Sequence, residues 1–212
     1  MTTTPDRRVA AIVLAAGGGE RFDGPAHKLL ALIDGRPLVV WAVAAAVEAG
    51  FESTFVVTGA VDLTEVLDRA GLLDRVTLVP NAQWMQGQAT SLAAGIVAAD
   101  AATADRDIDI DTDIDAAIDA VVVGLGDQPR IAAEAWRRVA TAHPDAPIVV
   151  ATYAGKRRNP VRLSRSIWSE LPGRGDEGAR ALMSRRPELV SEVGCPGEPV
   201  DVDTLEDLAR WS

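Results

Sequence analysis

Short, continuous apolar runs alternate with longer helical patterns along the first 150 residues, and this alternation constrains the fold more than any other feature of the chain. The run from Val9 to Ala15 is apolar at every position, which is typical of a parallel strand covered on both faces. We expect further strands at 54–58, 76–79, 120–124 and 148–152, and helices at 37–49, 62–70, 90–102 and 132–142. The pattern predicts a Rossmann-like α/β fold, with a mostly parallel sheet and helices on both faces.

The regular alternation of strands and helices ends at Gly155. Beyond it, the patterns predict short strands at 160–163 and 199–202 and helices at 177–185 and 204–211. Within 155–186, nine Lys or Arg stand against three acids, while the whole chain has a net charge of −10. A basic segment in an acidic protein indicates binding of a small anion, although chance clustering on a solvated helix face gives the same count. We expect one domain over 1–212, with an addition to the sheet at 155–200.

Composition excludes several classes of protein. A net charge of −10 argues against nucleic-acid binding, because a phosphate backbone requires a basic face. The longest uncharged apolar stretch, 37–47, is shorter than the roughly 18 residues that span a bilayer, and residues 1–8 do not resemble a signal peptide. Cys195 is the single cysteine and has no partner for an internal disulfide. We therefore expect a cytoplasmic protein that contacts no membrane.

The segment Asp105 to Asp119 holds seven Asp and one Arg, with Asp at nearly every second position. It lacks the glycine and the glutamate that an EF-hand calcium loop requires at its sixth and twelfth positions. Clustered like charges repel one another, so we expect a solvated acidic loop here.

A glycine-rich loop follows the first predicted strand. The backbone N–H groups of Gly17, Gly18 and Gly19 can approach a phosphate closely, and the carboxyl end of a strand is where open α/β sheets bind ligands. The spacing matches neither the dinucleotide-binding fingerprint nor the P-loop. The cations Arg21 and Lys28 follow the loop and are suited to neutralising a triphosphate. A plain surface turn remains the alternative.

Carboxylates follow two other predicted strands. Asp127 comes shortly after 120–124, and strand alternation would place Asp201 and Asp203 on one face of 199–202. Oxygen ligands of this kind suit Mg²⁺. Each cluster also has a simpler interpretation, because Asp127 precedes a turn at Pro129 and either Asp203 or Thr204 can cap the last helix.

Taken in order, these motifs resemble the MobA-like nucleotidyltransferases, and within them the molybdenum cofactor cytidylyltransferases. The resemblance spans Val9 to Trp211 and is carried by Leu14-Ala15-Ala16-Gly17-x-x-x-Arg21 with Lys28, Gly126-Asp127-Gln128-Pro129, Asn159-Pro160, Gly175-Asp176-Glu177-Gly178-Ala179-Arg180 and Asp201-Val202-Asp203-Thr204. It implies a fold of the nucleotide-diphospho-sugar transferase type. It also implies transfer of CMP from CTP to a phosphorylated acceptor, such as molybdopterin, with release of pyrophosphate.

The resemblance implies residue roles by position. Arg21, Lys28 and Asp127 would be catalytic, and Asp127 and Asp203 would hold Mg²⁺. The nucleotide would contact Leu14, Ala15, Ala16, Gly17, Gly18, Gly19, Thr58, Asn81, Gln88 and Ser91. The acceptor would contact Arg158, Asn159, Pro160, Gly178 and Arg180 in the added segment. Ala16 favours CTP, since relatives that use GTP carry glycine there.

Two features depart from the family pattern. Lys28 lies seven residues after Arg21 instead of five, and Gly19 stands near the place of the usual loop serine. A phosphomonoester acceptor is already ionised near neutral pH, because its second pKa is about 6, so no general base is required. His27 and His143 are accordingly expected at the surface.

The same motifs are compatible with other functions. One is nucleotidyl transfer to a phosphosugar or phospholactate. Another is a non-catalytic chaperone that binds nucleotide, although the presence of both metal carboxylates argues for catalysis. A molybdoenzyme or its chaperone is a further possible partner, as receiver of the product.

Overall fold

The computed structural model describes residues 7–24, 26–102 and 117–210 of the 212-residue chain. Most of the expected acidic loop at 105–119 lies outside these residues, as does the end of the expected helix at 204–211. Among the described residues, no helix is both long enough and apolar enough to cross a membrane.

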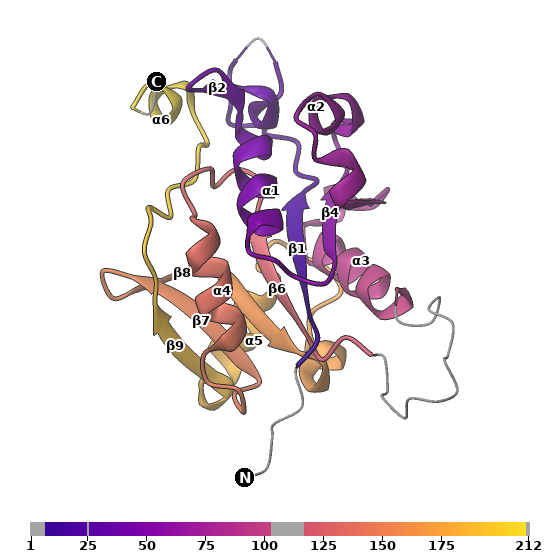
Figure 1. Ribbon diagram of the computed structural model, residues 1–212, viewed down its shortest axis with the longest axis vertical. Coiled ribbons are helices and arrows are strands. Elements are labelled where there is room, and N and C mark those ends of the chain that lie inside the picture. The colour runs from indigo at the N-terminus through magenta and orange to yellow at the C-terminus, as the bar shows by residue number, and fades with distance from the viewer. Residues whose placement is uncertain (1–6, 25, 103–116, 211–212) are drawn as a thin grey trace.

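A seven-stranded mixed sheet forms the centre of the molecule, in the order β5-β4-β1-β6-β8-β7-β9 (Figure 1). The strands are β1 (Val9–Ala15), β4 (Thr54–Thr58), β5 (Thr77–Pro80), β6 (Ala120–Leu125), β7 (Ile148–Tyr153), β8 (Lys156–Ser164) and β9 (Val190–Gly194). β1 is parallel to β4 and β6, and β5 is parallel to β4. β8 is antiparallel to both of its neighbours, whereas β9 is parallel to β7. The predicted α/β class is confirmed.

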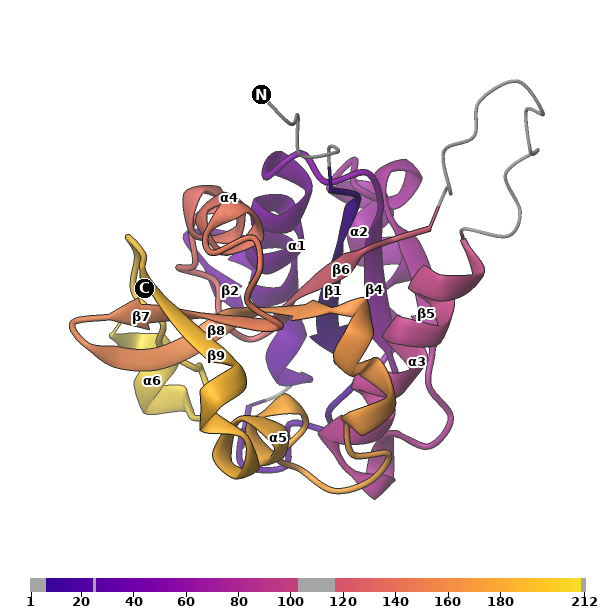
Figure 2. The ribbon, with the colours of Figure 1, turned by 90° about the horizontal axis from the view of Figure 1, so that it is seen from below.

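Helices cover both faces of the sheet (Figure 2). They are α1 (Leu38–Glu48), α2 (Thr64–Arg69), α3 (Gln88–Ala101), α4 (Ala133–Thr141), α5 (Ala179–Arg185) and α6 (Leu205–Ala209). Alternate side chains of β1 face the two apolar cores, one on each side of the sheet. Ala11 and Val13 pack with α1 and α4, whereas Ala10 and Ile12 pack with α3 and α5. A small hairpin of β2 (Leu32–Ile33) and β3 (Arg36–Pro37) precedes α1.

The prediction of a strand at 199–202 is wrong. That stretch forms no strand, and its Val202 is buried in a small cluster with Ile33 and Leu38. The last strand of the sheet is instead β9, whose mixture of Val, Ser, Glu and Gly carries little apolar signal because one side of this edge strand is open. The helix expected at 177–185 begins only at Ala179, after Gly178 with a φ of 50°.

Candidate functional site

Two adjoining clefts lie beyond the carboxyl ends of β1 and β6. The glycine cleft, of about 700 Å³, is lined by Leu14, Ala16, Gly17, Gly18, Gly19, Glu20, Arg21, Lys28, Trp84, Met85, Gly87, Gln88, Ser91, Leu125, Asp127, Asp176 and Asp203. The arginine cleft, of about 600 Å³, is lined by Leu125, Gln128, Val150, Arg157, Arg158, Asn159, Val161, Arg180, Met183, Ser184 and Asp201. Leu125, at the end of β6, belongs to both, so ligands in the two clefts would meet there.

Two of the three loop glycines, Gly18 and Gly19, have little room for a side chain because neighbouring side chains cover them, whereas a Cβ on Gly17 would meet nothing within 4 Å. A Cβ on Gly18 would lie 3.0 Å from the indole of Trp84, and one on Gly19 would lie 3.0 Å from Cγ of Lys28. Gly19 also has a φ of 66°, a conformation that other residues rarely adopt. The glycines thus let Trp84 and Lys28 close over the backbone of the loop.

His27 is half-buried and contacts the glycine loop, whereas the sequence predicted a position at the surface. Its Nε2 lies 3.0 Å from the carbonyl of Gly17, and its Nδ1 accepts a 3.3 Å bond from the N–H of Leu29. Both contacts together require the neutral tautomer with the proton on Nε2. Burial lowers the pKa of His27, and the ammonium of Lys28 lowers it further, which favours the same form.

A lysine joins the two carboxylates predicted to hold metal. Nζ of Lys28 lies 2.6 Å from Oδ2 of Asp127 and 3.0 Å from Oδ1 of Asp203, and the guanidinium of Arg21 lies 2.8 Å from the other oxygen of Asp203. Burial by itself would lower the pKa of Lys28, but the two carboxylates more than offset it and the pKa is raised. Lys28 is therefore a cation at neutral pH, and it reaches both acids in spite of its unusual spacing from Arg21.

The chemistry of this pair fits a divalent cation. Oδ1 of Asp127 is buried and has no hydrogen-bond partner among the described residues, although a buried carboxylate oxygen without one is costly. The part of the chain that the structure describes has no group of three or more His, Cys, Asp or Glu arranged for a metal. Two carboxylates suffice for Mg²⁺, which keeps water and substrate phosphates as its other ligands. Such an ion would compete with Lys28 for the carboxylates.

Asp201 and Asp203 do not share one face, contrary to the sequence prediction. Between them, the N–H of Val202 donates to the carbonyl of Asp127 at 3.2 Å, which fixes this segment beside the end of β6. Asp203 then lines the glycine cleft and Asp201 the arginine cleft. Thr204 is the residue that caps α6, in a capping box with Asp207, so Asp203 is not needed as the cap.

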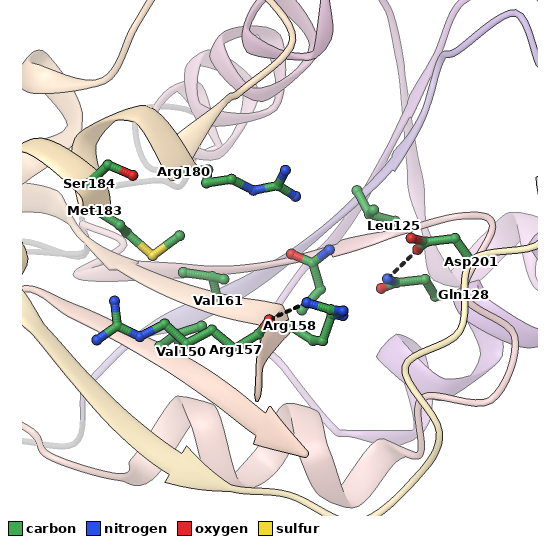
Figure 3. Close-up of a pocket in the computed structure, with 11 residues that line it drawn as sticks. Leu125, Gln128, Val150, Arg157, Arg158, Val161, Arg180, Met183, Ser184 and Asp201 are labelled. Carbon is green, nitrogen blue, oxygen red and sulfur yellow. Dashed lines mark hydrogen bonds between the residues drawn. The ribbon is translucent and has the colours of Figure 1, made fainter. Parts of the chain in front are cut away.

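The arginine cleft combines cations with an apolar wall (Figure 3). In the described part of the chain, Arg158 and Arg180 form no ion pair, whereas Arg157 is paired with Glu192 at 2.7 Å. At the opposite edge of the cleft, Nε2 of Gln128 donates to Oδ1 of Asp201 at 2.6 Å. Burial raises the pKa of Asp201, and the nearby carboxylates raise it further. Nη1 of Arg158 donates to the carbonyl of Arg157 at 2.9 Å. Because no carboxylate among the described residues pairs with Arg158 or Arg180, their guanidinium groups are the part of this cleft best suited to a phosphate.

Most of the predicted contact residues line the clefts, but several do not. In the nucleotide set, Ala15, Thr58 and Asn81 lie outside the glycine cleft. The Asn81 amide donates to the hydroxyls of Thr90 and Ser91, so it fixes the start of α3. In the acceptor set, Pro160 and Gly178 lie outside the arginine cleft.

Sequence reasoning missed Trp84, Met85 and Asp176 in the glycine cleft. It gave no role to Gln128, and it grouped Asp201 with the metal carboxylates, whereas both residues line the arginine cleft. The position of Gln128 directly after Asp127 was the available signal, since both follow the end of one buried strand.

Comparison with known proteins finds one family model and curated relatives with different names. The model of the MobA-like NTP transferase domain matches residues 11–190. The nicotine blue oxidoreductase of Paenarthrobacter nicotinovorans is 29% identical over 213 residues, 95% of each chain. The 2-C-methyl-D-erythritol 4-phosphate cytidylyltransferase of a Synechococcus strain is 36% identical over 80 residues, 37% of this chain and 33% of that protein.

Among solved structures, Rv0371c of Mycobacterium tuberculosis H37Rv is 28% identical and superposes with a TM-score of 0.72, covering 96% of this chain and 97% of the other. A structure of Rv0371c in complex with manganese covers the same shares, with a TM-score of 0.72 at 25% identity.

Proposed function

Since the chain belongs to the MobA-like NTP transferase family, we propose that it transfers CMP from CTP to a phosphorylated acceptor and releases pyrophosphate. One observation carries this proposal: a glycine loop with two cations and two carboxylates adjoins a second cleft with two unpaired arginines, and the two clefts meet at Leu125. The reaction needs this arrangement, since it joins two polyanions at one phosphorus atom.

The residues of the glycine cleft would bind the triphosphate. Gly17, Gly18 and Gly19 line the cleft, so their backbone N–H groups would bind the phosphates, and Arg21 and Lys28 would offset the phosphate charge. Mg²⁺, when bound by Asp127 and Asp203, would stabilise the charge that develops on the α-phosphate and on the leaving pyrophosphate. The manganese complex of Rv0371c supports a divalent ion in this family.

The arginine cleft would hold the acceptor. Arg158 and Arg180 would clamp its phosphate with one oxygen towards the nucleotide, and the wall formed by Val150, Val161 and Met183 would pack against its body. A phosphomonoester is ionised near neutral pH, so these residues need only orient it. We propose molybdopterin as the acceptor, on the resemblance of the motifs to the molybdenum cofactor cytidylyltransferases.

Two relatives bear on the choice of reaction. The similarity to a cytidylyltransferase supports CTP, as does Ala16 in the first loop. The relative named as an oxidoreductase covers more of the chain, but the loop Gly17 to Phe22 lacks the glycine spacing of a dinucleotide-binding fingerprint.

Pyrophosphate release with each of the four ribonucleoside triphosphates, with and without molybdopterin, tests this function. We expect release to require molybdopterin and Mg²⁺ and to be fastest with CTP. Equal or faster release with GTP would contradict the nucleotide assignment. A rate of pyrophosphate release that does not change when molybdopterin is added would contradict the assignment of molybdopterin as the acceptor.

Arg180→Ala is expected to raise the KM for the acceptor roughly tenfold to a hundredfold, because a charge-assisted hydrogen bond to phosphate is lost. The KM for CTP should change little, since Arg180 lines only the arginine cleft. Arg185→Ala is the matched control, as Arg185 is on the same helix and lines neither cleft. Steady-state kinetics with each substrate varied in turn will show which KM moves, and a rise in the KM for CTP alone would refute the assignment.

A further inference from the structure

A loop from the acceptor-binding segment returns to the glycine cleft. The N–H of Ala89 donates to the carbonyl of Gly175 at 2.9 Å, and the N–H of Gly175 donates to the carbonyl of Gln86 at 3.1 Å. The contact is so close that a Cβ on Gly87 would lie 2.4 Å from the carbonyl carbon of Gly175. The loop is thus fixed against the start of α3, which lines the glycine cleft.

This loop serves both clefts. Asp176 lines the glycine cleft, whereas Arg180, one turn later in the chain, lines the arginine cleft. The two residues form no ion pair in the described structure, because Asp176 precedes α5 and is not on the same helix surface as Arg180.

Asp176 is exposed, and its carboxylate is unpaired in the described part of the chain. Within the described ranges it makes no hydrogen bond or ion pair, whereas Asp127 and Asp203 in the same cleft are both paired with Lys28. A Cβ on Gly87 would lie 2.7 Å from Oδ1 of Asp176, so this carboxylate lies beside the turn that leads into α3. Gln88, Trp84 and the largely exposed Met85, which flank that turn in the sequence, line the same cleft. Asp176 and this turn thus give the cleft a carboxylate, an amide and apolar surface, while the cations Arg21 and Lys28 of the cleft are paired with Asp127 and Asp203.

These groups suit a nucleoside better than a phosphate. A carboxylate only accepts hydrogen bonds at neutral pH, and it repels a triphosphate. The donors that a nucleoside triphosphate carries are its ribose hydroxyls and, for cytosine, the amino group of the base. Apolar surface beside a single acceptor matches the nucleoside end of the ligand.

We propose that Asp176 accepts a hydrogen bond from the nucleoside, so that a loop of the acceptor-binding segment completes the nucleotide site. This inference rests on the proposed function and adds a specificity-determining residue to it. The donor is either a ribose O–H or an N–H of the base amino group. Analogues of CTP that lack one of these groups distinguish the two.

The test is calorimetric binding of CTP with Mg²⁺ in the absence of any acceptor. Asp176→Ala should weaken binding roughly tenfold to a hundredfold, the usual effect of losing a hydrogen bond to a charged group. Glu177→Ala is the matched control, since Glu177 is the next carboxylate in the loop and does not line the cleft, and it should bind CTP as the wild type does. Melting temperatures of both variants will show that the exposed loop tolerates the changes.

Analogues then identify the donor. If a ribose hydroxyl is bound, 2′-deoxy-CTP or 3′-deoxy-CTP should bind equally to wild type and Asp176→Ala. If the base amino group is bound, UTP, which lacks that group, should bind equally to wild type and Asp176→Ala. CTP binding to Asp176→Ala that is unchanged or tighter would overturn the inference, as would a variant effect that is the same for CTP and every analogue. Failure of the wild type to bind any of the four nucleotides would overturn the proposed function and this inference with it.

Discussion

Asp127→Asn is expected to lower kcat for nucleotidyl transfer by roughly a thousandfold, the scale seen when one charge-stabilising group is removed from an active site. The amide has nearly the same size as the carboxylate but no charge, so it would weaken both the hold on a divalent cation and the ion pair with Lys28. The melting temperature should change little, because Lys28 keeps Asp203 as a partner and Oδ1 of Asp127 has none to lose.

Asp34→Asn is the control for this variant. Asp34 is also paired with a cation, Arg130 at 3.2 Å, but it is 56% exposed and lines neither cleft. It should retain wild-type kcat. If Asp127→Asn keeps wild-type pyrophosphate release at saturating Mg²⁺, Asp127 serves only the turn at the end of β6 and the metal assignment is wrong.

Arg162→Leu is expected to cost about 4 kcal/mol or more of folding free energy, a large part of the 5–15 kcal/mol typical of a folded protein. Arg162 is fully buried in β8 and donates to the carbonyls of Ala140, Ala142, His143 and Ala146, where α4 ends. Leucine would remove all four of these hydrogen bonds and would leave the carbonyls of Ala140 and Ala142 without the donor that Arg162 supplies. It would also remove a cation from the negative end of the helix. Burial lowers the pKa of Arg162 to about 10, which still leaves it charged at pH 7.

Urea denaturation measures this effect, with Arg69→Leu as the control. Arg69 is 76% exposed and pairs only with Glu65 on the same helix, so its loss should change the free energy of unfolding by about 0.5 kcal/mol or less. Arg162→Lys should be intermediate, because one ammonium has fewer donors than a guanidinium. An unchanged urea midpoint for Arg162→Leu would show that water or backbone adjustment satisfies the carbonyls.

The elements that the sequence predicted well are those with a continuous apolar signal. β1 and β4 have the bounds expected from their apolar runs, because both faces of these strands are covered and nearly every residue is buried. β9 was missed because an edge strand exposes polar residues. Val200 and Val202 wrongly predicted a strand, because only Val202 is buried and the segment around it is not part of the sheet.

The site was predictable where a residue follows a strand end directly. Asp127 and the glycine loop are of this kind, and their meeting follows from adjacent parallel strands. The roles of Trp84 and Asp176 were not predictable in this way, since each reaches the glycine cleft through contacts between segments far apart in the chain. The contact of His27 with Gly17 spans only ten residues, but it depends on how the chain turns back after the loop. Asn81 has the right residue type for binding a base but uses its amide to fix α3.

The central claim is that the chain moves the α-phosphorus of CTP to an acceptor, and the fate of a label at that phosphorus tests it most directly. With CTP labelled at the α-phosphorus, Mg²⁺ and molybdopterin, we expect the label in a CMP–acceptor product and an equimolar amount of unlabelled pyrophosphate. Label that stays in CTP, or that appears only as free CMP, would contradict the account.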